Sequence, residues 1–281
     1  MTNQDAVLEL LGVEPGEHFK ADLHSHTVMS DGSDTHFELI GKARVHGVTH
    51  LAITNHDTVQ GLDHMMEVGR HRNFHVIGGV EISAWDSREK KRVHILGLGL
   101  TSNAPAITAL CEATLQARDE NTRWQMRTLQ QAGYSVNVER VEALAAQSTC
   151  MYKQHLMAGL TEAPYSSPDY QHLYKALFKN GGIAQRDIEY VDMCSAVEAI
   201  VADGGYAVLA HPGQFGNFDA VPHLVQAGLT GIEQFHPEHR GGEQAICHDL
   251  AQRYNLFVTG GSDYHGAYGK VPCPGYRTLS A

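Results

Sequence analysis

The sequence predicts an α/β fold with a largely parallel sheet or barrel and one helical insertion. Short apolar runs each end in a polar loop that contains glycine, and stretches with helical spacing follow most of these runs. One long stretch, from about residue 103 to residue 185, breaks this alternation. A regular succession of strand and helix is typical of βα units, whose strands are parallel.

The predicted strands are runs of apolar and β-branched residues, a composition that suits strands covered on both faces. A short run around Ala21–Leu23 comes first. The later runs are VTHLAIT (48–54), HVIGGVEIS (75–83), RVHILGLGL (92–100), YAVLAH (206–211), GIEQF (231–235) and LFVTGGSD (256–263).

Helices are predicted between most of these strands, because apolar residues recur there three or four positions apart. They cover residues 34–46, 60–72, 193–204 and 242–254. A chain of 281 residues suits one large α/β domain, or one domain with an insertion, better than two equal domains.

The insertion is predicted to be helical. Residues 104–133 have the pattern of one long helix, and shorter helices follow until the KNGG stretch near residue 180. We therefore expect residues 1–102 and 186–281 to form the barrel, and residues 103–185 to form a cap over the substrate site.

Composition narrows the choice of partners and compartment. The net charge of −11 argues against a surface for long nucleic acids. The five scattered cysteines form no CxxC pair, which favours a reducing compartment. With no signal-peptide pattern and no apolar run that could cross a bilayer, we predict a cytoplasmic protein without a membrane partner. The oligomeric state is left open.

Histidine and carboxylate side chains recur where predicted strands end, which is the rim where functional groups gather in α/β barrels. His94 is the exception, since it lies inside a run. Imidazole and carboxylate together suit Mn, Fe or Zn, and no cysteine stands among them. The candidate metal ligands are His24, His26, Asp31, His56, Glu81, His94, His211, Asp263 and His265.

Single members of this set have simpler explanations. Asp31 precedes a glycine, as aspartates in turns often do. Glu81 taken alone could be a strand-end carboxylate, and Asp263 taken alone could be a helix cap. Turn chemistry does not explain ligand types at the ends of so many separate strands, so the joint pattern favours a metal centre.

Several motifs together resemble the polymerase and histidinol phosphatase (PHP) domain of metal-dependent phosphoesterases. They occur in the family's order and span nearly all of the chain outside the insertion: DLHSHTVMSDG, ITNHDT, GVEIS, VHILG, AHPG and GSDYHG. The resemblance implies a distorted seven-stranded (β/α)7 barrel. It also implies two or three divalent ions at the carboxyl end of the strands, Mn²⁺ first, with Fe²⁺ or Zn²⁺ as alternatives.

The resemblance also implies how the ligands divide among the ions. His24, His26, Glu81 and Asp263 would hold one ion, and Asp31, His56 and His265 a second. Glu81 would bridge to a third ion held by His94 and His211. One departure stands out: Asn55 occupies a position where many members have aspartate, which puts any acid or base role there in doubt.

The implied function is hydrolysis of small phosphate esters by attack of a metal-bridging hydroxide on phosphorus. Nucleotide bisphosphates and cyclic phosphoribosyl phosphates are the expected substrates, cleaved by monoesterase or cyclic diesterase activity. Lys153, Arg186 and His155 are the candidate substrate contacts. His265 and Asp57 are candidates for catalytic roles, Asp57 either moving protons or orienting its loop.

The sequence leaves three alternatives open. The chain could be an exonuclease on short RNA ends, because its charge permits trimming of oligonucleotides. It could be a histidinol phosphatase. It could also be a non-catalytic metal-binding module, although every candidate ligand position holds a competent side chain.

Overall fold

One curved sheet carries the fold in the computed structural model, which describes residues 3–281. Its strands neighbour one another in the order β8-β7-β6-β4-β3-β2-β1-β9. Those that build the barrel are β1 (Lys20–Asp22), β2 (His50–Ile53), β3 (His75–Asp86), β4 (Lys91–Leu98), β6 (Tyr206–Leu209), β7 (Gly231–Phe235) and β8 (Phe257–Gly260). Each corresponds to a predicted run.

The two ends of this sheet meet and nearly close it. The Leu23 N–H donates to the Gly260 carbonyl at 2.9 Å, and a bridge pairs Ser25 with Tyr264. Two short strands lie outside this ring: β9 (Leu279–Ser280) pairs with β1, and β5 (Val191–Asp192) pairs with β3. The predicted distorted α/β barrel is therefore confirmed.

Strand β4 departs from the parallel arrangement, since it runs antiparallel to both β3 and β6. Only four residues, 87–90, join β3 to β4. A parallel crossover needs about a dozen residues or more, so such a short connection forces a hairpin. The hairpin also extends β3 to Asp86, so Glu81 lies inside this strand and not at its end as expected.

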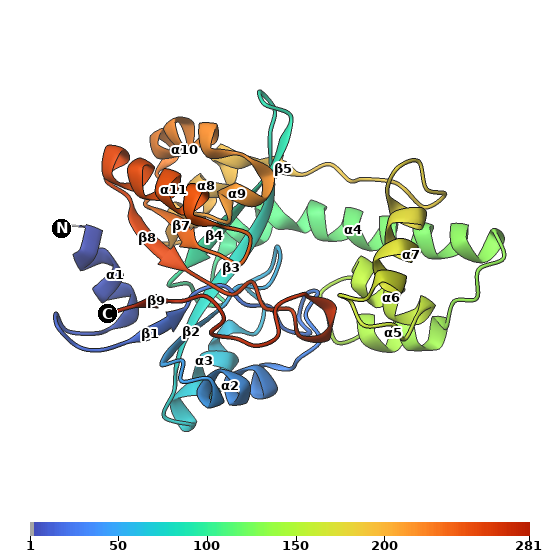
Figure 1. Cartoon of the computed structure of the whole chain (residues 1–281), viewed down its shortest axis with the longest axis horizontal. Coiled ribbons are helices and arrows are strands. Elements are labelled where there is room, and N and C mark those ends of the chain that lie inside the picture. The colour runs from blue at the N-terminus through green and yellow to red at the C-terminus, as the bar shows by residue number, and fades with distance from the viewer. Residues whose placement is uncertain (1–2) are drawn as a thin grey trace.

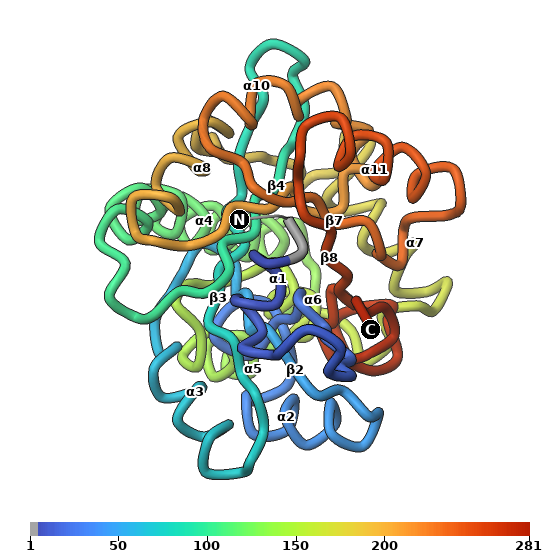
Figure 2. The backbone as a smooth tube through the Cα atoms, turned by 90° about the vertical axis from the view of Figure 1, so that its left-hand side faces the viewer, coloured from blue at the N-terminus to red at the C-terminus, as the bar shows by residue number. Residues whose placement is uncertain are grey.

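Helices surround the barrel, as Figure 2 shows in a view onto its end. The predicted helices are present with ends within two residues of the prediction: α2 (His36–Val45), α3 (Leu62–His71), α8 (Met193–Ala202) and α11 (Gly241–Tyr254). A capping box of Thr35 and Glu38 starts α2. Shorter segments complete this layer: α9 (Pro212–Phe215), η1 (Phe218–Ala220), α10 (Val221–Ala227) and η2 (Gly266–Tyr268).

Helix α1 (Asn3–Leu11) lies across the end of the barrel opposite the insertion (Figures 1 and 2). Its buried Val7 and Leu11 pack into a core with Ala21 and Leu96 of the strands. The helix was not predicted, because it is short and its apolar residues show no extended helical period.

The insertion consists of α4 (Pro105–Gln131), α5 (Val138–Ala145), α6 (Lys153–Leu160) and α7 (Pro168–Phe178). Helix α4 is the long helix predicted for residues 104–133. It extends away from the strands, and the other three gather around its far end (Figure 1). Ile107 of α4 belongs to the barrel core, whereas Leu129 belongs to a separate core with α5–α7, so α4 connects the two.

None of the helices in the described chain is both long and apolar enough to cross a membrane.

Candidate metal centre

The predicted metal ligands converge on Glu81, a carboxylate on the central strand β3 that is 1% exposed. The registers explain this meeting: β2 ends beside Gly78, and His56 in the next loop bridges to Glu81. On the other side of β3, His94 of β4 pairs with Ser83, which is two residues beyond Glu81. The β3–β4 hairpin therefore places His94 near the same carboxylate.

A first group surrounds Glu81 Oε2 and Asp263 Oδ1. His24 Nε2 lies 3.1 Å from the Glu81 oxygen and 3.4 Å from the Asp263 oxygen. His26 Nε2 lies 3.2 Å and 3.3 Å from the same two atoms. These are the four side chains predicted to hold one ion, and their ligand atoms lie close enough together to do so.

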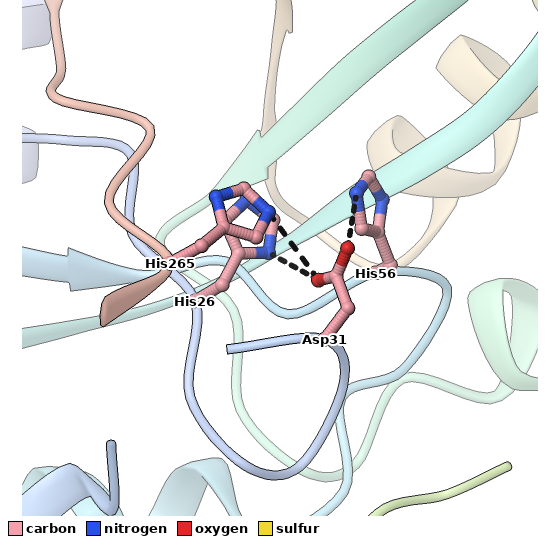
Figure 3. A group of neighbouring side chains, drawn as sticks. All are labelled: His26, Asp31, His56 and His265. Atoms are coloured by element: carbon pink, nitrogen blue, oxygen red, sulfur yellow. Dashed lines mark ion pairs between the residues drawn. The ribbon is translucent and has the colours of Figure 1, made fainter. Parts of the chain in front are cut away.

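A second group surrounds Asp31 (Figure 3). His265 Nε2 lies 3.4 Å from Asp31 Oδ1, and His56 Nε2 lies 3.9 Å from Oδ2. His26 Nδ1 faces the same carboxylate at 3.7 Å. Asp31 is thus placed as a ligand would be, while its loop still makes the turn that its sequence suggests.

A third group uses the other oxygen of Glu81. His94 Nδ1 lies 2.7 Å from Glu81 Oε1, and His211 Nε2 lies 2.8 Å from the same atom. His56 Nε2 is 3.4 Å from Oε2 and joins this group. The structure therefore brings together all nine predicted ligands, in groups that share Glu81 and several histidines.

The donor atoms fit metal ions better than they fit one another. His24 Nε2 and both ring nitrogens of His26 are buried and make no hydrogen bond. Buried polar atoms are normally satisfied, and lone pairs that face carboxylate oxygens repel them unless a cation lies between. These buried clusters of histidine and carboxylate could hold several divalent ions.

The electrostatic field of the cluster points the same way. Burial acts to lower the pKa of His24, but the Glu81 and Glu233 carboxylates outweigh it and hold this pKa well above its ordinary value. Burial also opposes the charge on His265, yet Asp31 and Asp263 raise the pKa of His265 to about 10. A site that draws protons onto imidazoles this strongly also attracts divalent cations.

Asn55 has a structural role. Its Oδ1 accepts hydrogen bonds from the Thr27 N–H at 2.8 Å, from Thr27 Oγ1 and from Ser30 Oγ. These bonds fix the loop that carries Asp31. An uncharged acceptor is sufficient for this purpose, and Asn55 is 1% exposed.

Asp57 is held in place by neighbours. Its Oδ2 accepts from Arg118 Nη2 at 2.5 Å, and its Oδ1 accepts from the Ser83 N–H at 2.8 Å. With both oxygens occupied, the geometry favours the loop-orienting role over proton transfer. The catalytic role stays a prediction.

Two cavities open from the cluster and share Asp31, His56, His94 and Gln154. One, of about 230 Å³, is lined by barrel loops together with Tyr165 of the insertion. The other, of about 180 Å³, is lined by four basic side chains and by the carboxylates of Asp31 and Asp187. The basic side chains are Arg92, Arg118, Lys153 and Arg186, and the last two are the cations predicted to contact substrate.

His155 does not face either cavity at the metal cluster. It is 2% exposed, and its Nδ1 accepts the Tyr152 N–H at 3.2 Å at the start of α6. The cavity that it does line lies beside Thr35 and Leu144, behind the loop of Asp31. This placement favours a role at the helix start, and substrate contact by His155 stays a prediction.

Besides Arg92 and Arg118, sequence reasoning missed three polar residues that contact proposed ligands. Glu233 on β7 is fully buried against His24, and His236 directly after β7 lies 3.4 Å from Asp263 Oδ2. Gln154 donates to Asp31 Oδ2 at 2.8 Å. His236 follows the end of a strand, as most of the candidate ligands do, and Glu233 is an acid inside a run predicted to be buried. Nothing in the sequence singles out Gln154.

Comparison with known proteins agrees with this centre. Residues 22–193 match the PHP domain model. A phosphoribosyl 1,2-cyclic phosphate 1,2-diphosphodiesterase of Eggerthella lenta is 54% identical, over 91% of this chain and 98% of that protein. A 3′,5′-nucleoside bisphosphate phosphatase of Chromobacterium violaceum is 28% identical, over 87% and 86%.

The solved structure of an amidohydrolase from Chromobacterium violaceum, with bound sulfate, superposes with a TM-score of 0.81 at 26% identity. The match covers 92% of this chain and 91% of that one. With its nearly closed barrel and its shared histidine and carboxylate cluster, this chain belongs to the PHP domain family of metal-dependent phosphoesterases.

Proposed function

We propose that this protein hydrolyses a phosphoribosyl 1,2-cyclic phosphate, first opening the cyclic diester and then removing the monoester that results. The observation that carries the proposal is the complete set of nine histidine and carboxylate candidates, Glu81 among them, in a chain 54% identical to the Eggerthella lenta diphosphodiesterase. Both steps are attacks of water on the same phosphorus, so one centre can perform them in sequence.

In this proposal the three groups around Glu81 and Asp31 hold two or three divalent ions. We favour Mn²⁺, with Fe²⁺ or Zn²⁺ as alternatives, because imidazole with carboxylate and no thiolate suits these metals. Bound ions would activate the attacking water and neutralise charge on the phosphoryl and leaving oxygens.

The chain's own side chains would orient the substrate. We assign the phosphate of the substrate that is not in the cyclic diester to the cavity lined by Lys153 and Arg186. There Lys153 Nζ lies 5.3 Å from the Phe178 ring, and the Arg186 guanidinium lies 5.1 Å from the Trp124 ring. An aromatic ring next to a cation limits the movement of that side chain but does not neutralise its charge, so the cation can still bind an anion. Gln154, hydrogen-bonded to Asp31, lies between the two cavities.

The insertion, residues 103–185, acts as a cap in this proposal. Tyr165, Lys153 and Gln154 of the insertion line the cavities opposite the barrel loops. A site of this size that the insertion covers suits a compact phosphate ester. The net charge of −11 disfavours long nucleic acids.

A substrate panel tests the proposal. Protein stripped of metal and reloaded with Mn²⁺, Fe²⁺ or Zn²⁺ is incubated with phosphoribosyl 1,2-cyclic phosphate, a nucleoside 3′,5′-bisphosphate, histidinol phosphate and a 5′-phosphorylated RNA oligonucleotide. We expect the cyclic diester to have the highest kcat/KM and to yield inorganic phosphate. Faster cleavage of the RNA or of histidinol phosphate would replace the proposed substrate, and no turnover of any compound would refute hydrolysis by this centre.

A further inference from the structure

Glu233 is a fully buried carboxylate that contacts two of the proposed metal ligands at once. It projects from β7, next to the strands that carry the cluster, and has 0% exposure. Its Oε1 and Oε2 lie 3.1 Å and 3.3 Å from His24 Nδ1. Oε2 also accepts the backbone N–H of His211 at 2.8 Å.

The contact with His24 fixes which ring nitrogen carries hydrogen. A carboxylate accepts but does not donate, so His24 Nδ1 must bear the proton when it faces Glu233. Nε2 of the neutral ring then keeps its lone pair, and Nε2 is the atom 3.1 Å from Glu81 Oε2. Glu233 thus presents the metal-binding nitrogen of His24 to the cluster.

The contact with His211 holds an unfavourable backbone. His211 has φ of 26° and ψ of 56°, a conformation that non-glycine residues rarely adopt and that is stable only when its surroundings enforce it. The Glu233 carboxylate accepts a hydrogen bond from the His211 N–H, and the His211 ring lies 2.8 Å from Glu81 Oε1. The same side chain therefore orients ligands on both sides of Glu81.

Glu233 could instead belong to a metal site of its own with His24 and His236. The hydrogen positions oppose this. His236 Nδ1 accepts the Glu238 N–H at 3.1 Å, so Nε2 of its neutral ring carries the proton and offers no lone pair. His24 Nδ1 would have to give up its proton, and its Nε2 would then be lost to the first group.

Gly261, directly after β8, makes space for the Glu233 carboxylate because it has no side chain. A Cβ at this position would lie 2.3 Å from His24 Cβ and 2.8 Å from Glu233 Oε1. Only glycine lets the end of β8 approach the pair so closely. The contact between His24 and Glu233 is thus enclosed by backbone.

We propose that Glu233 is a positioning residue that fixes the His24 tautomer and the His211 backbone, and so prepares the metal cluster for binding. The inference rests on the ligand roles proposed for His24 and His211. Carboxylates behind metal-binding histidines commonly act in this way.

The test compares Glu233→Gln with Asp22→Asn. Asp22 is a matched control, because it is also a fully buried carboxylate that accepts backbone N–H groups, from Ser262 and Gly275 and, at 3.4 Å, from His24, but it contacts no imidazole ring. Zn²⁺ dissociation constants are measured by competition with a chelating dye. The tautomer of His24 is read from ¹⁵N spectra of histidine-labelled, Zn²⁺-loaded protein, with His24→Gln assigning the signals.

We expect Glu233→Gln to weaken Zn²⁺ binding about 10- to 100-fold and to change the His24 nitrogen signals, while Asp22→Asn leaves those signals in place. Unchanged affinity and an unchanged tautomer in Glu233→Gln would overturn the inference while the metal centre stands. A wild type that binds no Zn²⁺ would overturn both. Should Glu233→Gln not fold, Glu233→Asp, whose shorter carboxylate cannot reach both partners, is expected to weaken binding in the same direction, and wild-type affinity there would contradict the role.

Discussion

The guanidinium of Arg118 and the carboxylate of Asp57 form an ion pair that connects the helical insertion to the loop of His56. Nη2 of Arg118, on α4, lies 2.5 Å from Asp57 Oδ2, and both side chains are largely buried. Asp57 follows His56 directly and has φ of 57°. Tyr152 adds a second tie, since its hydroxyl donates to the His56 carbonyl at 3.1 Å. The position of His56 therefore depends on the insertion.

Arg118→Met should destabilise the fold by about 3–5 kcal/mol, because it leaves the Asp57 carboxylate buried without its partner. Asp57→Asn should cost a similar amount by stranding the guanidinium. The double variant should cost clearly less than the sum of the two single changes. Urea unfolding of all four proteins measures this coupling, and additive losses would show that the pair does not act as a unit.

His94→Gln and His155→Gln separate a proposed ligand from a buried histidine that lines neither cavity at the metal cluster. His94 contacts Glu81. Mutating a residue that only supports a metal ligand typically lowers metal affinity or activity about 10- to 100-fold. His94 is a proposed ligand itself, so His94→Gln should lower kcat by more than this. His155→Gln should lose about 1 kcal/mol of stability, as for other helix-start contacts, with kcat nearly unchanged. Equal losses of kcat would contradict the assignment of both residues.

Lys153 should make substrate binding pH-dependent. Burial, together with the nearby Lys179, lowers the pKa of Lys153 to about 8. The side chain is charged below this pH and neutral above it, so KM for a phosphorylated substrate should stay flat up to about pH 8. Above that, KM should rise toward about tenfold per pH unit, because binding then requires uptake of a proton.

Lys153→Arg is the matched control for this profile, since arginine keeps its charge over the whole range. Its KM should show no rise between pH 8 and pH 10, whatever its absolute value. A wild-type KM that stays flat to pH 10, or the same rise in both proteins, would remove Lys153 from the substrate site.

The sequence predicts the barrel well because burial on both faces leaves a clear pattern. The run GIEQF coincides with β7, Gly231–Phe235. The direction of β4 has no such signature, since an antiparallel strand between two buried neighbours is as apolar as a parallel one. The eight residues between HVIGGVEIS and RVHILGLGL were the available clue, because they leave no room for a crossover helix.

The site was predictable to the extent that it follows strand ends. His24, His56 and Asp263 do so, and His94 is drawn in by its hairpin pairing with Ser83. Contacts with the insertion were not predictable, since Arg118 and Gln154 meet Asp57 and Asp31 only through the packing of α4 and α6. The placement of His155 was not predictable for the same reason: its position on α6 turns it toward the helix start.

Metal titration tests the central claim most directly. Protein stripped with a chelator is reloaded with Mn²⁺ in steps, and metal per chain is measured by elemental analysis alongside release of phosphate from the cyclic diester. We predict negligible turnover in the stripped protein and activity that rises only as the cluster around Glu81 fills toward two or three ions per chain. Full activity in protein with well under one metal per chain would contradict the account.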